Sequence, residues 1–233
     1  MVKDNGGEMV VSRAVIKRRI SEEKDWTKRL IVEPLLKPII LNEVSISLDF
    51  HLGNRFAIYP RRRIGHHRPI SELFHDISLP EFFVPMGRDL ILHPGEVLLG
   101  TTLEWFCLPC DLMAYVIGRS IWGRRGLVIA TALAVQPAST GLITLELTNV
   151  GDVSIYLNPG TCIGQLFFHQ VHEPYLDDSG RRSSFSGSGR PQLGEYCMQE
   201  SEKKLFRYQR QEKMASPKMR EGEYCRMSFM GPV

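Results

Sequence analysis

Gly141-Leu-Ile-Thr-Leu-Glu-Leu-Thr-Asn149 is the stretch that decides the fold of this 233-residue chain. Its apolar and polar side chains alternate with the two-residue period of a β-strand that buries one face. Glu146 therefore points away from the face that carries Leu145 and Leu147. If the Glu146 face is open to water, this residue is an ordinary surface acid. If it lines a closed pocket, loss of water raises the carboxyl pKa toward the range that suits a general base.

Similar short runs follow one another along the chain, with Gly, Pro and Asn between them. The turn signals His93-Pro-Gly95 and Asn158-Pro-Gly160 each precede a further run. Many short strands at this spacing are typical of an all-β barrel or a jelly-roll-like sandwich, so we predict a mainly β fold. The runs expected to form strands are Val44–Leu48, Arg55–Tyr59, Asp89–Leu92, Val97–Leu103, Met113–Ile117, Leu127–Ala130, Leu142–Leu147, Val153–Leu157 and Gly164–Phe168.

A short amphipathic helix is expected before the strands, from Ser12 to Ile20. Ser12 is a suitable N-cap residue, and an apolar stripe follows at helical spacing. Since the stripe has a single face, the helix is expected to pack against the strands. Its members are Val11, Val15, Ile16 and Ile20.

Charge and composition limit the partners of the chain. Lys and Arg number 29 against 26 Asp and Glu, a net charge of +3, so no nucleic-acid partner is expected. The basic runs Lys17–Arg19 and Arg61–Arg63 are typical of solvated faces. No apolar run approaches the about 20 residues needed to cross a bilayer, and the N-terminus lacks a secretory core. We expect a cytoplasmic protein without membrane contact.

Five scattered cysteines fit free thiols in a reducing compartment. Cys107-Leu-Pro-Cys110 suggests a zinc site, because zinc-dependent base deaminases hold their metal with a Cys-x-x-Cys pair. Those enzymes also need a His-x-Glu motif, and His93-Pro-Gly-Glu96 has the wrong spacing. The pattern favours two ordinary thiols at the end of a strand, and we expect no zinc.

Gly118-Arg-Ser-Ile-Trp-Gly-Arg-Arg-Gly126 is the second informative stretch. Glycines allow backbone angles that bring N–H groups close to an anion. Arg119 and Arg124 have guanidinium groups that fork onto phosphate oxygens, and Ser120 adds a hydroxyl. A basic surface turn with ordinary glycines explains the same residues. As a binding loop, it would form a nucleotide site together with the carboxylate of Glu146.

Six blocks of the chain, in this order, resemble the dCTP deaminases, members of the trimeric dUTPase-like superfamily. The resemblance extends roughly from residue 12 to residue 194. It implies a distorted jelly-roll or β-clip barrel of the dUTPase-like type, with a short N-terminal helix, in a homotrimer whose sites form between subunits. It also implies conversion of dCTP to dUTP and ammonia, without zinc, on the magnesium complex of the triphosphate. The blocks are Ser45–Asn54, Leu92–Glu104, Leu108–Leu112, Gly118–Ser120, Thr144–Leu147 and Pro159–Phe168.

The same resemblance assigns roles to individual residues. It implies that Glu146 takes a proton from water as hydroxide attacks C4 of cytosine, and returns it toward the leaving amine. Ser120 and Arg124 support the reacting centre and, with Arg119, hold the phosphates. Carbonyls near residues 131 and 132 hold the base and water, residues 135 and 136 lie against the deoxyribose, and the tail covers the nucleotide. The other implied substrate contacts are Ile121, Thr131, Ala132, Val135, Gln136, Thr144, Tyr175, Ser184 and Ser188.

Four of these positions depart from the family pattern. Ile121 stands where many members carry a second serine, and Gln136 stands where an aspartate is common. Ser184 and Ser188 stand near the tail positions of a lysine and a glutamine. Nearby cations that compensate for the missing lysine would be Arg181, Arg182 or Arg190.

The alternating pattern of apolar residues ends after Tyr175, and this change sets the expected domain limits. We predict an N-terminal extension at 1–10, a deaminase-like domain at 11–194 with a covering tail from about 175, and a charged, partly disordered extension at 195–233. Two alternatives stay open. One is a dUTP diphosphatase, alone or combined with deamination, although dUTPases rely on an aspartate where this chain has Gln136. The other is a catalytically silent nucleotide-binding relative.

Overall fold

The computed structural model describes residues 10–35, 46–58, 79–172 and 187–191. These residues all belong to one compact unit, Met1–Gly194. The predicted extensions at 1–10 and 195–233 lie outside the described residues, except for Val10. The elements are α1 (Arg13–Ser21), β1 (Ile31–Glu33), β2 (Leu48–His51), β3 (Arg55–Ile58), β4 (Glu81–Phe83), β5 (Leu90–Leu92), β6 (Val97–Cys107), β7 (Leu112–Gly118), α3 (Ser120–Gly123), β8 (Leu127–Ile129), β9 (Ala134–Val135), β10 (Thr140–Asn149), β11 (Ile155–Leu157) and β12 (Cys162–Gln170).

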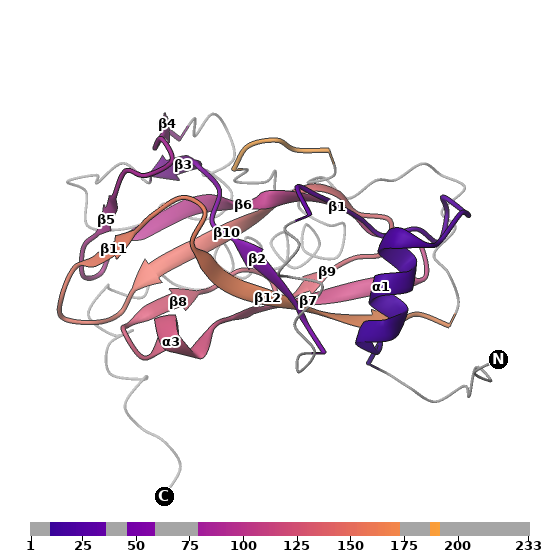
Figure 1. The fold of residues 1–233 in the computed structure, drawn as a ribbon. Coiled ribbons are helices and arrows are strands. Elements are labelled where there is room, and N and C mark those ends of the chain that lie inside the picture. The colour runs from indigo at the N-terminus through magenta and orange to yellow at the C-terminus, as the bar shows by residue number, and fades with distance from the viewer. Residues whose placement is uncertain (1–9, 36–45, 59–78, 173–186, 192–233) are drawn as a thin grey trace, which may run out of the picture. The chain divides into compact units, whose positions relative to one another are not determined.

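The described strands form three antiparallel sheets (Figure 1). The largest has the order β4-β3-β6-β10-β8, and β1 also pairs with β6. The second has the order β2-β12-β7-β9, and the third pairs β11 with β5. The prediction of a mainly β fold with a short N-terminal helix is confirmed.

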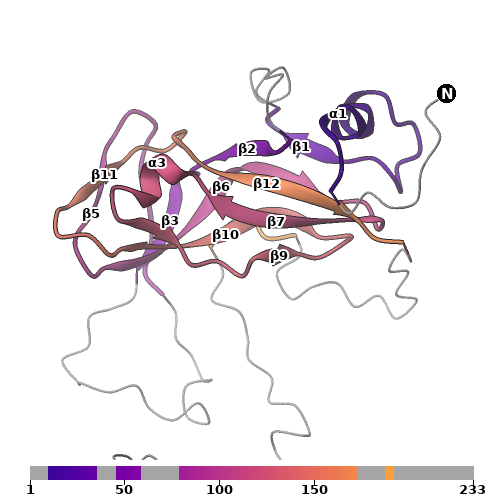
Figure 2. The ribbon, with the colours of Figure 1, turned by 90° about the horizontal axis from the view of Figure 1, so that it is seen from below.

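One hydrophobic core lies between the two larger sheets. Leu145 and Leu147 of β10 and Leu166 and Phe168 of β12 are all fully buried in it. Figure 2 shows the layer of β7 and β12 lying over β6 and β10. The alternation read from residues 141–149 is therefore confirmed, because it places Leu145 and Leu147 on the inner face of the largest sheet.

The alternation in β10 is interrupted just before Glu146. The register with β6 shifts between Leu142 and Thr144, and the N–H of Ile143 donates to Thr102 Oγ1 at 3.0 Å. Such a β-bulge bends its strand and redirects the side chains that follow. Since the bulge depends on a hydroxyl from β6, the local sequence of β10 does not reveal it.

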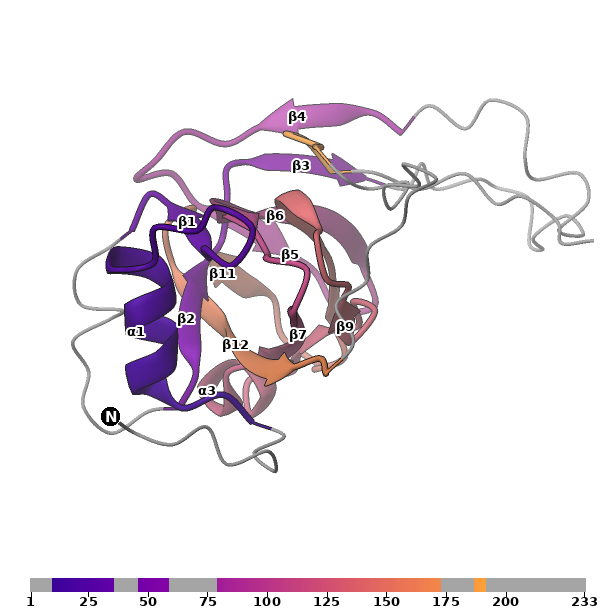
Figure 3. The same ribbon diagram turned by 90° about the vertical axis from the view of Figure 1, so that its right-hand side faces the viewer.

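Helix α1 confirms the predicted stripe. Val11, Ile16 and Ile20 are buried, and the N–H of Val11 donates to Phe168 O of β12 at 2.8 Å. Figure 3 shows the helix alongside β2. Ser12 is the N-cap in extended conformation, but its side chain makes no capping hydrogen bond.

The basic run in α1 is not wholly a solvated face. Lys17 and Arg18 are exposed, whereas Arg19 is only 7% exposed and forms an ion pair with Asp111. Its Nη1 also donates to the carbonyl of Lys28 at 2.9 Å. The expectation of a solvated run is wrong for Arg19, because this residue lies on the helix face that carries Ile16 and Ile20. The run at 61–63 lies outside the described residues.

Two features of the strand pattern differ from expectation. The strand expected at Val44–Leu48 is observed at Leu48–His51, since Leu48 and Phe50 are buried while Ile46 is 53% exposed. The sequence pattern missed β1, β4 and β9, which have only two or three residues each.

Both predicted turns are confirmed, with positive φ values of 74° at Gly95 and 85° at Gly160. No helix in the described part of the chain has the length and apolar character to cross a bilayer.

Candidate active site

Glu146 lies half-buried on the face of β10 that points away from the core. Its register partner on β6 is Leu99, which is 2% exposed. Within the described residues, the Glu146 carboxylate has no hydrogen-bond or ion-pair partner. Burial raises the pKa of the Glu146 carboxyl above its ordinary value. Glu146 is therefore partly shielded from water, and its place in a closed pocket stays a prediction.

The chain crosses from the largest sheet to β9 directly beside Glu146. The N–H of Ala130 donates to Glu146 O at 2.8 Å, and the N–H of Glu146 donates to Thr131 Oγ1 at 2.9 Å. The Thr131 hydroxyl also donates to the carbonyl of Thr144 at 3.4 Å. The structure therefore brings Thr131, Thr144 and Glu146 together, with Ala132 next in the chain.

The carbonyl groups of this crossing segment differ in whether a described residue bonds them. Leu133 O accepts from the N–H of Val116 at 2.8 Å, which fastens the segment to β7. The carbonyls of Thr131 and Ala132 have no hydrogen-bond partner in the part of the chain that the structure describes. Acceptors at these positions suit a ligand that donates hydrogen bonds, such as an amino group or water.

Val135 and Gln136 lie at the far end of the crossing segment. Val135 is half-buried in β9, opposite Ala114 of β7. Gln136 is exposed and begins a turn in which the N–H of Ser139 donates to its carbonyl at 3.3 Å. The turn also contains Ala138 at a positive φ of 59°. The amide of Gln136 is thus available to a ligand that lies along β9.

The arginine segment is a single helical turn, α3, which lies next to β8 (Figure 1). The N–H groups of Trp122 and Gly123 both donate to Arg119 O, and that of Arg124 donates to Ser120 O. These three N–H groups already have acceptors and do not line an anion cradle. Anion binding by the turn stays a prediction, for which the side chains of the turn are the available groups.

Gly126 closes the turn and is the one glycine of residues 118–126 with a positive φ, at 90°. A Cβ at Gly126 would lie 2.8 Å from the backbone nitrogen of Gly151. The special conformation predicted for all three glycines is therefore found at Gly126 alone, where the backbone of residue 151 leaves no room for a side chain.

Arg119 is held on one side of α3. Its Nη1 donates to Asp49 Oδ2 and to Cys162 Sγ, both at 3.0 Å. Ser120, Ile121 and Arg124 are exposed, and Ile121 is 52% exposed. Among the residues that the structure describes, the Arg124 side chain has no partner. Arg119 thus offers an anchored guanidinium, Arg124 an unanchored one and Ser120 a hydroxyl.

Sequence reasoning missed three residues of this region. Asp49 and Cys162 contact Arg119, and Leu99 lies opposite Glu146. A signal for Asp49 was present, because it is a lone acid between the apolar residues Leu48 and Phe50. Nothing in the local sequence links Cys162 to Arg119.

The predicted tail contacts are only partly described. Ser188 is 7% exposed and forms a parallel bridge with Gly141, at the start of β10. Its hydroxyl donates to Arg190 O at 2.8 Å. The structure does not place Ser188 beside Glu146. Tyr175, Ser184, Arg181 and Arg182 lie outside the described residues.

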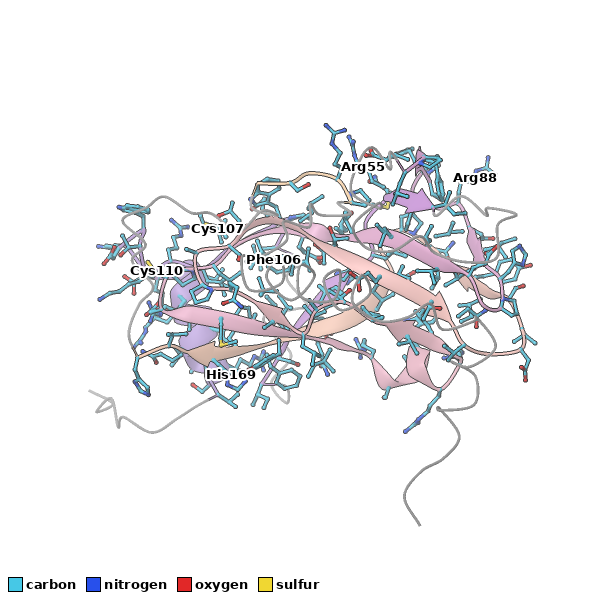
Figure 4. The ribbon with its side chains drawn as sticks, turned by 180° about the vertical axis from the view of Figure 1, so that it is seen from behind. Arg55, Arg88, Phe106, Cys107, Cys110 and His169 are labelled. Carbon is cyan, nitrogen blue, oxygen red and sulfur yellow. The ribbon has the colours of Figure 1, made fainter. Side chains whose placement is uncertain are left out.

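The two cysteines considered for zinc lie where β6 ends and in the turn to β7 (Figure 4). Cys107 Sγ accepts from Thr140 Oγ1 at 3.4 Å, and Cys110 Sγ donates to Thr27 O at 3.7 Å. Both are free thiols. In residues 10–35, 46–58, 79–172 and 187–191, no group of three or more His, Cys, Asp or Glu is arranged to hold a metal ion. The absence of zinc stays a prediction.

Comparison with known proteins identifies relatives over most of the chain. Residues 10–171 match a family model described as dCTP deaminase-like. The dCTP deaminase of Natronomonas pharaonis is 38% identical over 187 residues, which is 79% of this chain and 93% of that protein. The dCTP deaminase of Haloarcula marismortui is 39% identical over 187 residues with the same coverage. A dUMP-forming dCTP deaminase of Dictyoglomus turgidum is 36% identical over 167 residues, which is 71% of this chain and 82% of the relative.

Among solved structures, the 2′-deoxycytidine 5′-triphosphate deaminase of Agrobacterium tumefaciens has a TM-score of 0.52 at 21% identity. The match covers 70% of this chain and 47% of that chain. This likeness concerns the fold, and it confirms the predicted fold class. The family model and the curated relatives show that the chain belongs to the dCTP deaminase family.

Proposed function

We propose that this protein deaminates dCTP to dUTP and ammonia, and that Glu146 moves the proton. The observation that carries the proposal is the half-buried Glu146 carboxylate, which has no partner among the described residues. The backbone of Glu146 is bonded to Ala130 and to the Thr131 hydroxyl, at the start of the segment whose carbonyls at residues 131 and 132 have no described partner. The names of the relatives support the choice of substrate. The reaction is hydrolytic and breaks the C–N bond of a cyclic amidine.

The proposed mechanism uses one acid for both proton transfers. The Glu146 carboxylate accepts a proton from water while the resulting hydroxide forms a bond to C4 of cytosine and the C4=N3 π electrons move to N3. As N3 returns this pair to C4, the bond from C4 to the amino nitrogen breaks, and Glu146 gives its proton to that nitrogen, which leaves as ammonia. The proton of the new C4 hydroxyl passes to N3, which yields the uracil base. Burial of Glu146 supports both steps, because a carboxyl with a raised pKa is a stronger base toward water and remains able to donate.

The crossing segment holds the base under this proposal. The carbonyls of Thr131 and Ala132 accept hydrogen bonds from the cytosine amino group and from the attacking water. The Thr131 hydroxyl, bonded to the backbone of Glu146, fixes the distance between these acceptors and the catalytic strand. Val135 packs against the deoxyribose, and the Gln136 amide bonds the 3′-hydroxyl without adding charge.

The triphosphate meets Arg119, Ser120 and Arg124 of the α3 turn. These cations and this hydroxyl bind phosphate oxygens directly. The Mg²⁺ is proposed to arrive already bound to the triphosphate. We further propose that Ile121 contacts the phosphates, that Thr144 lies below the base, and that Tyr175, Ser184 and Ser188 of the tail cover the bound nucleotide. The deaminase domain is proposed to extend from 11 to 194, with 195–233 as an extension. A reaction on free dCTP suits a cytoplasmic protein.

A homotrimer with sites between subunits completes the proposal. The outer face of the β2-β12-β7-β9 sheet carries a row of apolar side chains that are half-buried or exposed in the single chain, and such rows are typical of subunit interfaces. Tyr115 of this row packs edge-on against His169, with ring centroids 4.8 Å apart. The row consists of Met113, Tyr115, Ile117 and Phe167.

The test is to incubate the purified full-length protein and Mg²⁺ with dCTP, CTP, dCMP or dUTP, and to identify every product by chromatography and an ammonia assay. Formation of dUTP and ammonia from dCTP supports the proposal. Formation of dUMP and pyrophosphate as well would identify the dUMP-forming reaction after which some relatives are named. Binding of dCTP without release of ammonia would refute the deaminase assignment. Light scattering of the same sample measures the proposed trimer.

A further inference from the structure

The anchoring of Arg119 goes beyond the roles assigned so far. We propose that Asp49 and Cys162 are positioning residues of the triphosphate site, which occupy Nη1 of Arg119 and so present its remaining N–H edge to the phosphates. This inference rests on the proposed function, in which Arg119 binds the triphosphate of dCTP.

Both anchors use the same nitrogen atom. Nη1 of a guanidinium carries two hydrogens, and the two acceptors at 3.0 Å, Asp49 Oδ2 and Cys162 Sγ, account for both. Nε and Nη2 of Arg119 have no partner in the described part of the chain. Their N–H groups lie parallel in one plane, which matches two oxygens of a phosphate.

The anchors belong to a stiff part of the fold. Asp49 on β2 is paired with Gln165 on β12, the strand that also carries Cys162. The N–H of Arg119 donates to Ile163 O at 2.9 Å, and the Trp122 ring Nε1 donates to Cys162 O at 3.0 Å. The α3 turn is therefore bonded to Cys162 and Ile163 of β12, and Cys162 also holds the Arg119 side chain.

The approach of β12 to β2 also excludes a looser arrangement. A Cβ at Gly164 would lie 2.1 Å from the ring of Phe50, so the two strands meet at van der Waals contact. The backbone that carries the two anchors thus packs against the core residue Phe50, which is fully buried. A rigid support of this kind reduces the conformational entropy that Arg119 loses when phosphate binds.

The two anchors act in different ways. The Asp49 pair is partly exposed, with side-chain exposures of 43% for Arg119 and 30% for Asp49, so solvent weakens its charge attraction. Burial raises the pKa of the Cys162 thiol, so sulfur stays protonated at neutral pH and serves as a neutral acceptor. Its Sγ donates to Gly164 O at 3.9 Å and accepts from Arg119 Nη1 at 3.0 Å. Orientation of the guanidinium, more than added charge, is thus the expected contribution.

The test is steady-state kinetics of the full-length protein with Mg-dCTP. We expect Asp49→Ala to raise KM about tenfold and Cys162→Ala to raise it about threefold, with kcat within about twofold of the wild type. Asp49→Asn and Cys162→Ser retain an acceptor and are expected to recover most of the affinity. In an Arg119→Ala background, Asp49→Ala is expected to raise KM no further, because the group through which it acts is gone. Cys110→Ala is the control for loss of a thiol remote from Arg119.

Several results would overturn the inference. They are an unchanged KM in both alanine variants, an equal rise in KM with and without Arg119, or a loss that falls on kcat alone. If thermal unfolding shows that an alanine variant is misfolded, Asp49→Asn replaces it in the comparison with Arg119→Ala. A small rise in KM caused by Asp49→Asn supports the proposal if it disappears when residue 119 is changed by Arg119→Ala. A rise that persists in the Arg119→Ala variant refutes the proposal. Wild-type protein that does not deaminate dCTP refutes the proposed function, whereas an active wild type with unaffected variants refutes only the positioning role.

Discussion

Two glutamates on neighbouring strands of one sheet have opposite surroundings. Glu104 of β6 is fully buried, and it accepts the backbone N–H of His51 at 2.9 Å while its other oxygen lies 2.6 Å from the His51 ring Nδ1. Glu146 of β10 is half-buried, and its carboxylate has no partner in the described residues. The deeper acid is the one with partners.

This contrast shows that partners, more than depth, distinguish an acid suited to proton transfer. Hydrogen bonds to both oxygens stabilise a carboxylate and fix it in place. Burial without such bonds raises the pKa of a carboxyl group, as it does for Glu146. Glu104 therefore has the contacts of a structural acid, and the surroundings of Glu146 support its proposed role in proton transfer.

The largest effect is expected at Glu146 itself. Glu146→Gln removes the proton acceptor and keeps the shape, so we expect kcat for dCTP to fall by about 10³-fold or more while the dissociation constant of dCTP changes little. Ammonia release and equilibrium binding are the measurements. Glu33→Gln, at an exposed position on β1, is the control. A variant that keeps more than a tenth of the wild-type kcat would refute the assigned role.

The second effect concerns the structural acid. His51→Ala leaves one oxygen of the fully buried Glu104 without its partner, and we expect a loss of about 3 kcal/mol in the free energy of unfolding. Urea denaturation measures this loss, at one fixed protein concentration because the proposed assembly would contribute to stability. His93→Ala is the matched control, since its exposed ring bonds Ser154 at 2.9 Å. Equal stability of the two variants would show that Glu104 does not depend on His51.

The raised pKa of Glu146 also predicts how the stability of the protein depends on pH. Burial raises the pKa of Glu146 in the folded chain above the ordinary value of 4.5. The contribution of protonated Glu146 to the free energy of unfolding is therefore complete below pH 4.5, and it is lost as pH rises through the folded-state pKa. Glu146→Gln is therefore expected to have a higher Tm than the wild type at pH 7, and the difference should close at about pH 4. Thermal unfolding at both pH values is the measurement. A lower Tm at pH 7 would mean that the carboxylate has a stabilising partner.

The comparison also explains what the sequence can reveal. Glu104 in Leu103-Glu-Trp105 and Glu146 in Leu145-Glu-Leu147 have the same local pattern, a lone acid between apolar residues. What separates them is His51, which lies 53 positions away from Glu104. Strands such as β7 and β10 were predictable because alternation is local. The partners of Glu104 depend on how distant strands pair, so they were not.

The arginine turn illustrates the same limit. The glycines of residues 118–126 predicted an open backbone cradle, but the chain forms the helical turn α3 with its own carbonyls as acceptors. The anchors of Arg119 lie 70 and 43 positions away, at Asp49 and Cys162. Residue types therefore indicated the chemistry of this turn, and strand pairing determined its geometry.

The smallest and most specific effect is expected at Leu99, the apolar residue opposite Glu146. Directly paired side chains in an antiparallel sheet are close enough to touch, so Leu99→Asn would bring an amide donor to the Glu146 carboxylate. That bond favours the ionised form and gives Glu146 a partner, as Glu104 has. We expect the pKa of Glu146 to fall, so the acid limb of the pH profile of kcat/KM should move by roughly half a unit to lower pH. Leu99→Met keeps the side chain apolar and is the matched control. Because ionisation of the nucleotide affects both variants equally, the difference between their acid limbs reports on Glu146. If both variants have the same acid limb, desolvation opposite Leu99 does not set the proton affinity of Glu146.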